Sequence, residues 1–98
     1  MIKRVLILSC LVASPVEAAT IQNACLRADR GATTVLCQCI QVAAEQTLSN
    51  RDQRKAARFF SDPQRAQDTR QSNRGSNEAF WARYTRFIEV AEEMCGAS

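Results

Sequence analysis

The sequence predicts a single all-α domain of four to five short helices, held together as a small bundle by disulfide bonds. Three observations support this fold class. The chain is 98 residues long, which is enough for one domain. Its apolar residues recur at helical spacing, without the alternation typical of strands. It contains five cysteines but only three glycines and two prolines, too few for a loop-rich disulfide scaffold or a turn-rich sandwich.

The N-terminal segment is typical of an export signal. A short basic start precedes an apolar run over residues 5–13, and small residues favour cleavage after Ala18. The apolar run is far shorter than the roughly 20 residues needed to cross a bilayer. We therefore expect residues 1–18 to be a signal peptide and residues 19–98 to be a periplasmic or secreted domain without a transmembrane segment.

Periodicity and capping residues predict the first two helices over residues 21–29 and 35–48. Gly31 is expected to end the first helix in a left-handed conformation, and Thr33 or Thr34 to cap the second. The inward stripe expected on the second helix consists of Leu36, Ile40, Ala43 and Thr47. The residues expected to face solvent are Gln38, Gln41 and Glu45.

Three further helices are predicted in the second half of the chain. Their expected ranges are 50–60, 64–71 and a last helix from Ser76 or Asn77 to Cys95, and the alternative for 64–71 is a frayed turn. Ser49 and Pro63 are typical helix-start residues, and Gly96 is a typical C-terminal cap. The apolar side expected on the first of these helices is Ala56, Ala57 and Phe60. The stripe on the last helix, which should supply most of the core volume, is Phe80, Tyr84, Phe87, Ala91 and Met94.

Cleavage of the signal would leave four of the five cysteines, namely Cys25, Cys37, Cys39 and Cys95. In an oxidising compartment we expect them to form two disulfides. Cys37 and Cys39 would point about 200° apart on a helix, which disfavours a bridge between them. Two pairings remain, 25–37 with 39–95 and 25–39 with 37–95. We favour the first because Cys39 lies nearer the inward stripe, and the second stays open.

The Cys37-Gln38-Cys39 motif has a second interpretation as a thiol–disulfide redox site, because closely spaced thiols can exchange disulfides. Such a pair would be expected in a thioredoxin-like βαβ setting, which the pattern does not contain. Structural zinc sites usually combine two cysteine knuckles, whereas this chain has one C-x-C and two distant cysteines. We therefore expect structural disulfides, no metal site and no cofactor.

Residues 51–74 form a basic stretch whose cations are Arg51, Arg54, Lys55, Arg58, Arg65, Arg70 and Arg74. The first four would share one side of the helix predicted over residues 50–60. The functional interpretation of this face is a docking site for an anionic partner, either a protein, a lipid headgroup or an envelope polymer. Nucleic acid is not expected, because an exported protein rarely meets it. The competing interpretation is a solvated helix face with local pairs such as Asp52 with Lys55.

No catalytic constellation is visible. The chain has no histidine, no G-x-S-x-G motif and no glycine-rich phosphate loop, so we expect no enzyme and no catalytic residues. Glu92 and Glu93 are adjacent and would point in different directions. Aromatic residues on the last helix could line a ligand pocket, but at helical spacing we expect them to be core; they are Phe80, Trp81, Tyr84 and Phe87.

The chain resembles a group of small exported four-cysteine helical proteins of bacteria, some of which carry the label "arginine transporter". The features that match are an export signal, the cysteines at 25, 37 and 39, segments 47–54, 59–63 and 80–84, and the terminal Cys95-Gly96. The resemblance covers nearly the whole mature chain and implies no functional residues. Because no spanning segment would survive cleavage, the label implies at most a soluble accessory or binding role.

These observations predict a small exported, non-catalytic interaction or binding module whose partner is unknown. One alternative is a redox protein that uses Cys37 and Cys39. Another is a soluble carrier of a small ligand, such as an amino acid, that uses the aromatic helix. The redox potentials of the bridges and ligand-induced thermal stabilisation distinguish these functions.

Overall fold

The computed structural model describes residues 19–28 and 31–96 and confirms the all-α prediction. In these ranges there are five helices and no strand: α1 (Thr20–Ala28), α2 (Thr34–Thr47), α3 (Asn50–Ser61), α4 (Pro63–Arg70) and α5 (Gly75–Cys95). Each predicted helix is present, with its ends within two residues of the expected positions. The predicted signal peptide, residues 1–18, lies outside the described residues.

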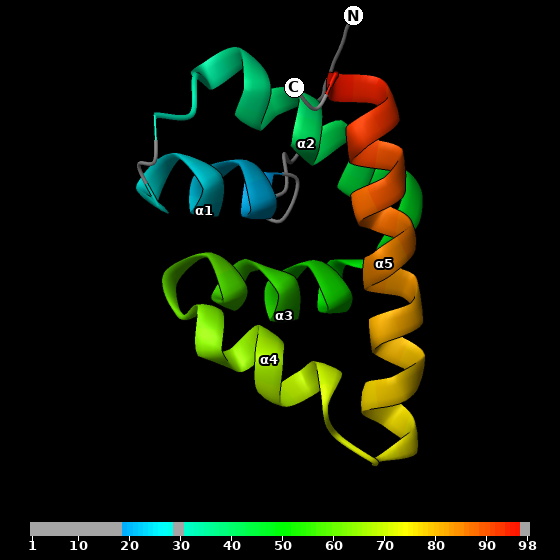
Figure 1. Ribbon diagram of the computed structural model, residues 1–98. Coiled ribbons are helices and arrows are strands. Elements are labelled where there is room, and N and C mark those ends of the chain that lie inside the picture. The colour runs from blue at the N-terminus through cyan, green and yellow to red at the C-terminus, as the bar shows by residue number, and fades with distance from the viewer. Residues whose placement is uncertain (1–18, 29–30, 97–98) are drawn as a thin grey trace, which may run out of the picture.

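The helices are arranged as two hairpins and one long helix. Figure 1 shows α1 antiparallel to α2, α3 antiparallel to α4, and α5 running along the ends of both pairs. The closest packing is between α2 and α5, between α1 and α3, and within the α1–α2 hairpin. α5 therefore spans the molecule, with its first half beside α3 and α4 and its second half beside α2.

Local capping explains where these helices begin and end. The Thr33 hydroxyl accepts a hydrogen bond from the Leu36 N–H at 3.0 Å, and the Ser49 hydroxyl accepts one from the Asp52 N–H at 3.1 Å. Gly31 and Gly96 adopt positive φ angles of 80° and 63°, which a glycine tolerates without strain. The predicted caps at Thr33, Ser49 and Gly96 are confirmed, and Gly31 has the predicted left-handed conformation.

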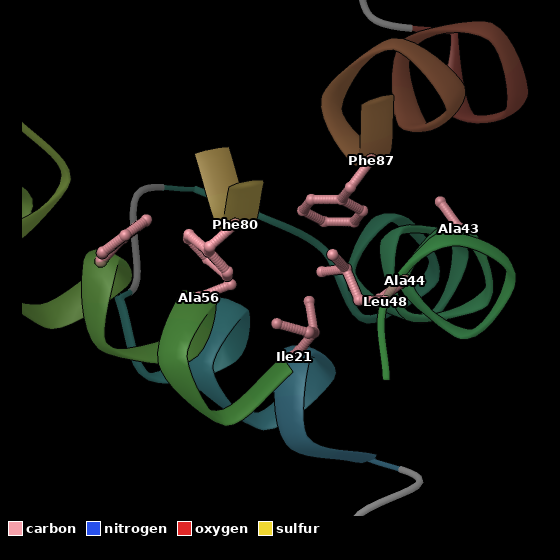
Figure 2. Close-up of a cluster of buried hydrophobic side chains, with 8 residues drawn as sticks. Ile21, Ala43, Ala44, Leu48, Ala56, Phe80 and Phe87 are labelled. Carbon is pink, nitrogen blue, oxygen red and sulfur yellow. The ribbon is translucent and has the colours of Figure 1, made fainter. Parts of the chain in front are cut away.

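The core lies where α5 crosses the other helices. Phe80 and Phe87 of α5 are 2% and 1% exposed, and Figure 2 shows them pointing toward Ile21, Ala56 and Leu48. Phe59 of α3 packs edge-on against Phe80, with ring centroids 5.9 Å apart. Small alanines on α2 and α3 let the helices approach closely around these rings, so α5 supplies the large core side chains as predicted.

The inward face of α2 differs from the prediction. Gln41 was expected in solvent but is only 5% exposed, whereas Leu36 was expected in the core and is 37% exposed. The helix is turned because the bond from Cys37 to Cys25 points that face toward α1. Burial of Gln41 is tolerated because its amide makes three hydrogen bonds, to the Gln22 N–H, Glu45 and Gln53.

The last turn of α5 also departs from the expected stripe. Met94 was predicted to be buried and is 41% exposed. Cys95 is bonded to Cys39 of α2, so it points toward α2. Adjacent residues on a helix project about 100° apart, and Met94 is therefore directed away from that contact.

Candidate anion-binding site

A groove of about 590 Å³ lies between α3 and the first half of α5. It is lined by residues of both helices: Arg51, Asp52, Arg54, Lys55 and Arg58 of α3, and Ser76, Ala79, Phe80 and Arg83 of α5. All four cations of the predicted anionic-partner face therefore meet in one concave site. The structure adds Arg83 from a helix that the sequence analysis had assigned to the core.

The α3 cations share one side of the helix because of their spacing. Positions 51, 54, 55 and 58 follow the i, i+3, i+4, i+7 pattern, which repeats once per helical turn. Ala56 and Phe59 occupy the opposite side and are buried in the core. Burial of that apolar side turns the cations toward the groove.

Among the described residues that line the groove, Asp52 is the single carboxylate. Its two oxygens accept hydrogen bonds from Arg83, at 2.6 Å from Nε and 3.1 Å from Nη2. This bond raises the pKa of Arg83 above its ordinary value, so the guanidinium stays charged. The local pair of Asp52 with Lys55 that the spacing allowed is not formed; the partner is a residue 31 positions away.

Lys55 is held at the side of the groove by two contacts with α5. Its Nζ donates a hydrogen bond to Asn77 Oδ1 at 2.7 Å and lies 4.6 Å from the centre of the Phe80 ring. The ring face attracts the ammonium group electrostatically. Lys55 and Arg83 are therefore pre-positioned cations, each oriented by a neighbour before any ligand arrives.

The remaining cations of the basic stretch lie outside the groove. Arg65, Arg70 and Arg74 belong to α4 or to the loop that follows it. Arg65 lies 3.3 Å from the Asp62 carboxylate at the start of α4, and both side chains are exposed. The structure thus divides a stretch that looked continuous in sequence into a grooved part on α3 and a separate exposed part.

The cysteines form the disulfides Cys25–Cys37 and Cys39–Cys95. This is the favoured pairing, and it ties α1 to α2 and α2 to the end of α5. Cys25 and Cys37 are buried, whereas Cys39 and Cys95 are half-buried. The two cysteines of the C-x-C motif belong to different bridges. Disulfides of this kind are typical of proteins in an oxidising extracellular environment.

A second, apolar groove of about 400 Å³ lies between α2 and the second half of α5. Leu36 and Ile40 form one wall, and Tyr84, Phe87 and Ile88 form the other. Tyr84 is half-buried there, and desolvation raises the pKa of its phenol above the ordinary value of 10.0. The aromatic helix therefore contributes mainly to the core, as expected, and partly to the wall of this groove.

The polar groups that join the helices are not predicted by the sequence pattern. Gln53, which is 1% exposed, donates hydrogen bonds to the Leu48 carbonyl at 3.2 Å and to Glu45 at 3.3 Å, and accepts one from Gln41. This network connects α1, α2 and α3, and none of its side chains lines the basic groove. No local signal marks it, because the partners are up to 19 residues apart.

The chemistry available in the basic groove is binding of negative charge by guanidinium and ammonium groups. Across residues 19–28 and 31–96, no three His, Cys, Asp or Glu residues are gathered in a way that could hold a metal ion. None of the helices described is both long and apolar enough to cross a membrane.

Comparisons with protein-family models, curated proteins and solved structures find no match to this chain.

Proposed function

We propose that this chain is a small, non-catalytic interaction module that binds an anionic partner in the groove between α3 and α5. One observation carries the proposal, namely that the groove gathers five cations and a single carboxylate, which Arg83 already neutralises. Opposite charge is attracted most strongly in concave sites, where the walls exclude part of the water that would screen it. An anionic ligand would therefore meet several cations at once.

The identity of the cations supports recognition of carboxylate or phosphate groups. Four of the five are arginines, whose planar guanidinium can donate two parallel hydrogen bonds to one such group. Lys55 and Arg83 are already oriented by their contacts with Asn77 and Asp52. Less side-chain freedom is lost on binding when a cation is held in place beforehand.

We place this activity in the periplasm or outside the cell. The N-terminal sequence is typical of an export signal, and two disulfides are suited to an oxidising compartment. The resemblance to small exported bacterial proteins agrees with this location. In that compartment the anionic partners available to the groove are proteins, lipid headgroups and envelope polymers.

Retention of the purified, disulfide-bonded protein on immobilised polyanions tests the proposal. The panel consists of polyglutamate, a sulfated polysaccharide and supported phosphatidylglycerol bilayers. The wild type should be retained by at least one of them and released by added salt, because salt screens charge. The variant Arg51→Gln/Arg58→Gln should be released at lower salt.

The matched control is Arg70→Gln/Arg86→Gln, which removes two exposed cations that do not line the groove. It changes the net charge equally, so it should elute close to the wild type. Equal losses in the two variants would mean that only net charge matters. That result, or no retention on any matrix, would contradict the proposal.

The apolar groove supports the small-ligand alternative as a second candidate function. Its lining is almost entirely apolar, and the Tyr84 phenol supplies a polar group at its wall. A ligand that binds there should raise the melting temperature, whereas an Ile88→Arg variant should lose that increase. The redox alternative has no comparable observation, because Cys37 and Cys39 are bonded to different partners.

A further inference from the structure

The basic groove has a shape and a charge spacing that select among anions. On α3, Arg51 and Arg58 are seven residues apart, which corresponds to about 10 Å along the helix axis. Arg54 and Lys55 lie between them, one turn from each end. The cations thus form a row longer than a single phosphate group and suited to a ligand that carries repeated charges.

The surroundings of the groove argue against a membrane surface as the ligand. A helix that docks on a bilayer inserts large apolar side chains beside its basic residues. Among the residues that the structure describes, the exposed large apolar ones are Leu26, Val35, Leu36, Val42, Ile88 and Met94, and none of them lines the groove. Among the described residues, no exposed large apolar side chain therefore stands beside its cations to enter the bilayer.

The aromatic content of the groove argues against nucleic acid. Single strands are bound by stacking bases on exposed aromatic rings. Phe80 is the single aromatic side chain in the lining; it is buried, and Lys55 lies over its face. No ring surface is left for a base, so phosphate contacts would act alone.

We infer that the ligand of this groove is an acidic segment of a partner polypeptide, with carboxylates that repeat along the row of α3 cations. The inference rests on the proposed function and specifies its ligand. Carboxylates on one side of an extended peptide repeat every two residues, or about 6.6 Å, and on a helix every three to four residues, about 5–6 Å apart. Both spacings are close to the about 5–6 Å that separates α3 cations three or four residues apart.

A second copy of this chain fits the basic groove less well than an acidic peptide does. Glu89, Glu92 and Glu93 are exposed on the second half of α5. Three carboxylates would leave at least one of the four α3 cations of the groove unpaired.

The test is fluorescence anisotropy with a labelled oligoglutamate peptide, using oligoglutamine of the same length as the neutral control. Wild-type protein should bind the acidic peptide and not the neutral one. Arg51→Gln/Arg58→Gln should lower the affinity about tenfold, as expected for the loss of two partly screened pairs. Arg70→Gln/Arg86→Gln should leave it within about twofold. Circular dichroism verifies that both variants are folded.

Two competition measurements distinguish this inference from the proposed function. Inorganic phosphate should displace the peptide only at high concentration, and phosphatidylglycerol vesicles should compete poorly. Groove-dependent binding of vesicles or free phosphate without peptide binding would overturn the acidic-peptide inference and leave the anion-binding function intact. If no anion bound the two variants with different affinity, both the acidic-peptide inference and the anion-binding function would be contradicted. Salt-sensitive self-association that disappears in Arg51→Gln/Arg58→Gln would identify a second copy as the occupant.

Discussion

The two hairpins of this molecule are held by different means. The α1–α2 hairpin and the end of α5 are joined by two disulfides. The α3–α4 hairpin carries none and is held to α5 by the Asp52–Arg83 pair, the Lys55–Asn77 hydrogen bond and contacts of the Phe59 ring. The disulfide-bonded half is therefore constrained even in the unfolded chain. The α3–α4 half depends on contacts that exist only in the folded protein.

Binding and stability depend on the same residues in only one of these two halves. In the half without disulfides, Asp52, Lys55 and Arg83 both join α3 to α5 and line the basic groove. In the half with disulfides, the cross-links lie away from that groove. Changes to the groove should therefore alter the α3–α5 contact, while changes to the bridges should act on global stability.

The largest expected effect is loss of the Cys39–Cys95 bridge. It joins residues 56 positions apart, against 12 for Cys25–Cys37, so it restricts the unfolded chain more. Chain entropy gives about 4 kcal/mol for the long bridge and about 3 kcal/mol for the short one. Cys39→Ala/Cys95→Ala should thus lose more stability in urea unfolding than Cys25→Ala/Cys37→Ala. The reverse order would show that native packing around the buried bridge outweighs chain entropy.

The buried glutamines should come next, because they join the two halves. Gln53→Leu deprives the Leu48 carbonyl and the Gln41 amide of a partner inside the protein. An unsatisfied buried polar group costs about 1–3 kcal/mol, so we expect a loss of about 2 kcal/mol in chemical unfolding. Gln46→Leu, at an exposed position of α2, is the matched control and should change stability little. Equal effects would contradict a structural role for the network.

The Asp52–Arg83 pair should show an asymmetric response. Arg83→Gln leaves a buried carboxylate without its cation, whereas Asp52→Asn leaves an arginine side chain that is half exposed and can be hydrated. We expect Arg83→Gln to cost about 1–2 kcal/mol and Asp52→Asn less. Thermal unfolding of both single variants and the double variant measures the coupling. A larger loss in Asp52→Asn would mean that Asp52 acts mainly on its own helix.

The smallest expected effect is a change in stability at alkaline pH, and it comes from Tyr84 in the groove between α2 and α5. Because burial raises the pKa of Tyr84, the unfolded chain releases the phenolic proton at a lower pH than the folded chain. The stabilising contribution is complete below pH 10.0 and is lost as pH rises above it. Tyr84→Phe should remove this part of the pH dependence of the unfolding free energy. The free energy is measured at each pH in a rapid unfolding experiment, before the disulfides can exchange. An unchanged slope would assign the titration to other groups.

The fold was largely predictable because its signals are local. Helical periodicity, the caps at Thr33 and Ser49 and the terminal Gly96 involve residues a few positions apart. The basic row of α3 was predictable for the same reason, since its members lie within two turns. The burial of Gln41 and the exposure of Leu36 were not, because a disulfide to another helix and a distant amide decide which side of α2 faces inward.

The helices, the four cysteines beyond the signal-like start and the basic row on α3 follow from local sequence, because propensity, capping and charge spacing act over one or two turns. Only the tertiary structure decided the pairing of the cysteines, the partner of Asp52 and the joining of α3 to the first half of α5 as a groove. These features unite residues that are 12 to 56 positions apart. Packing of the whole core selects such contacts, and no local pattern records them.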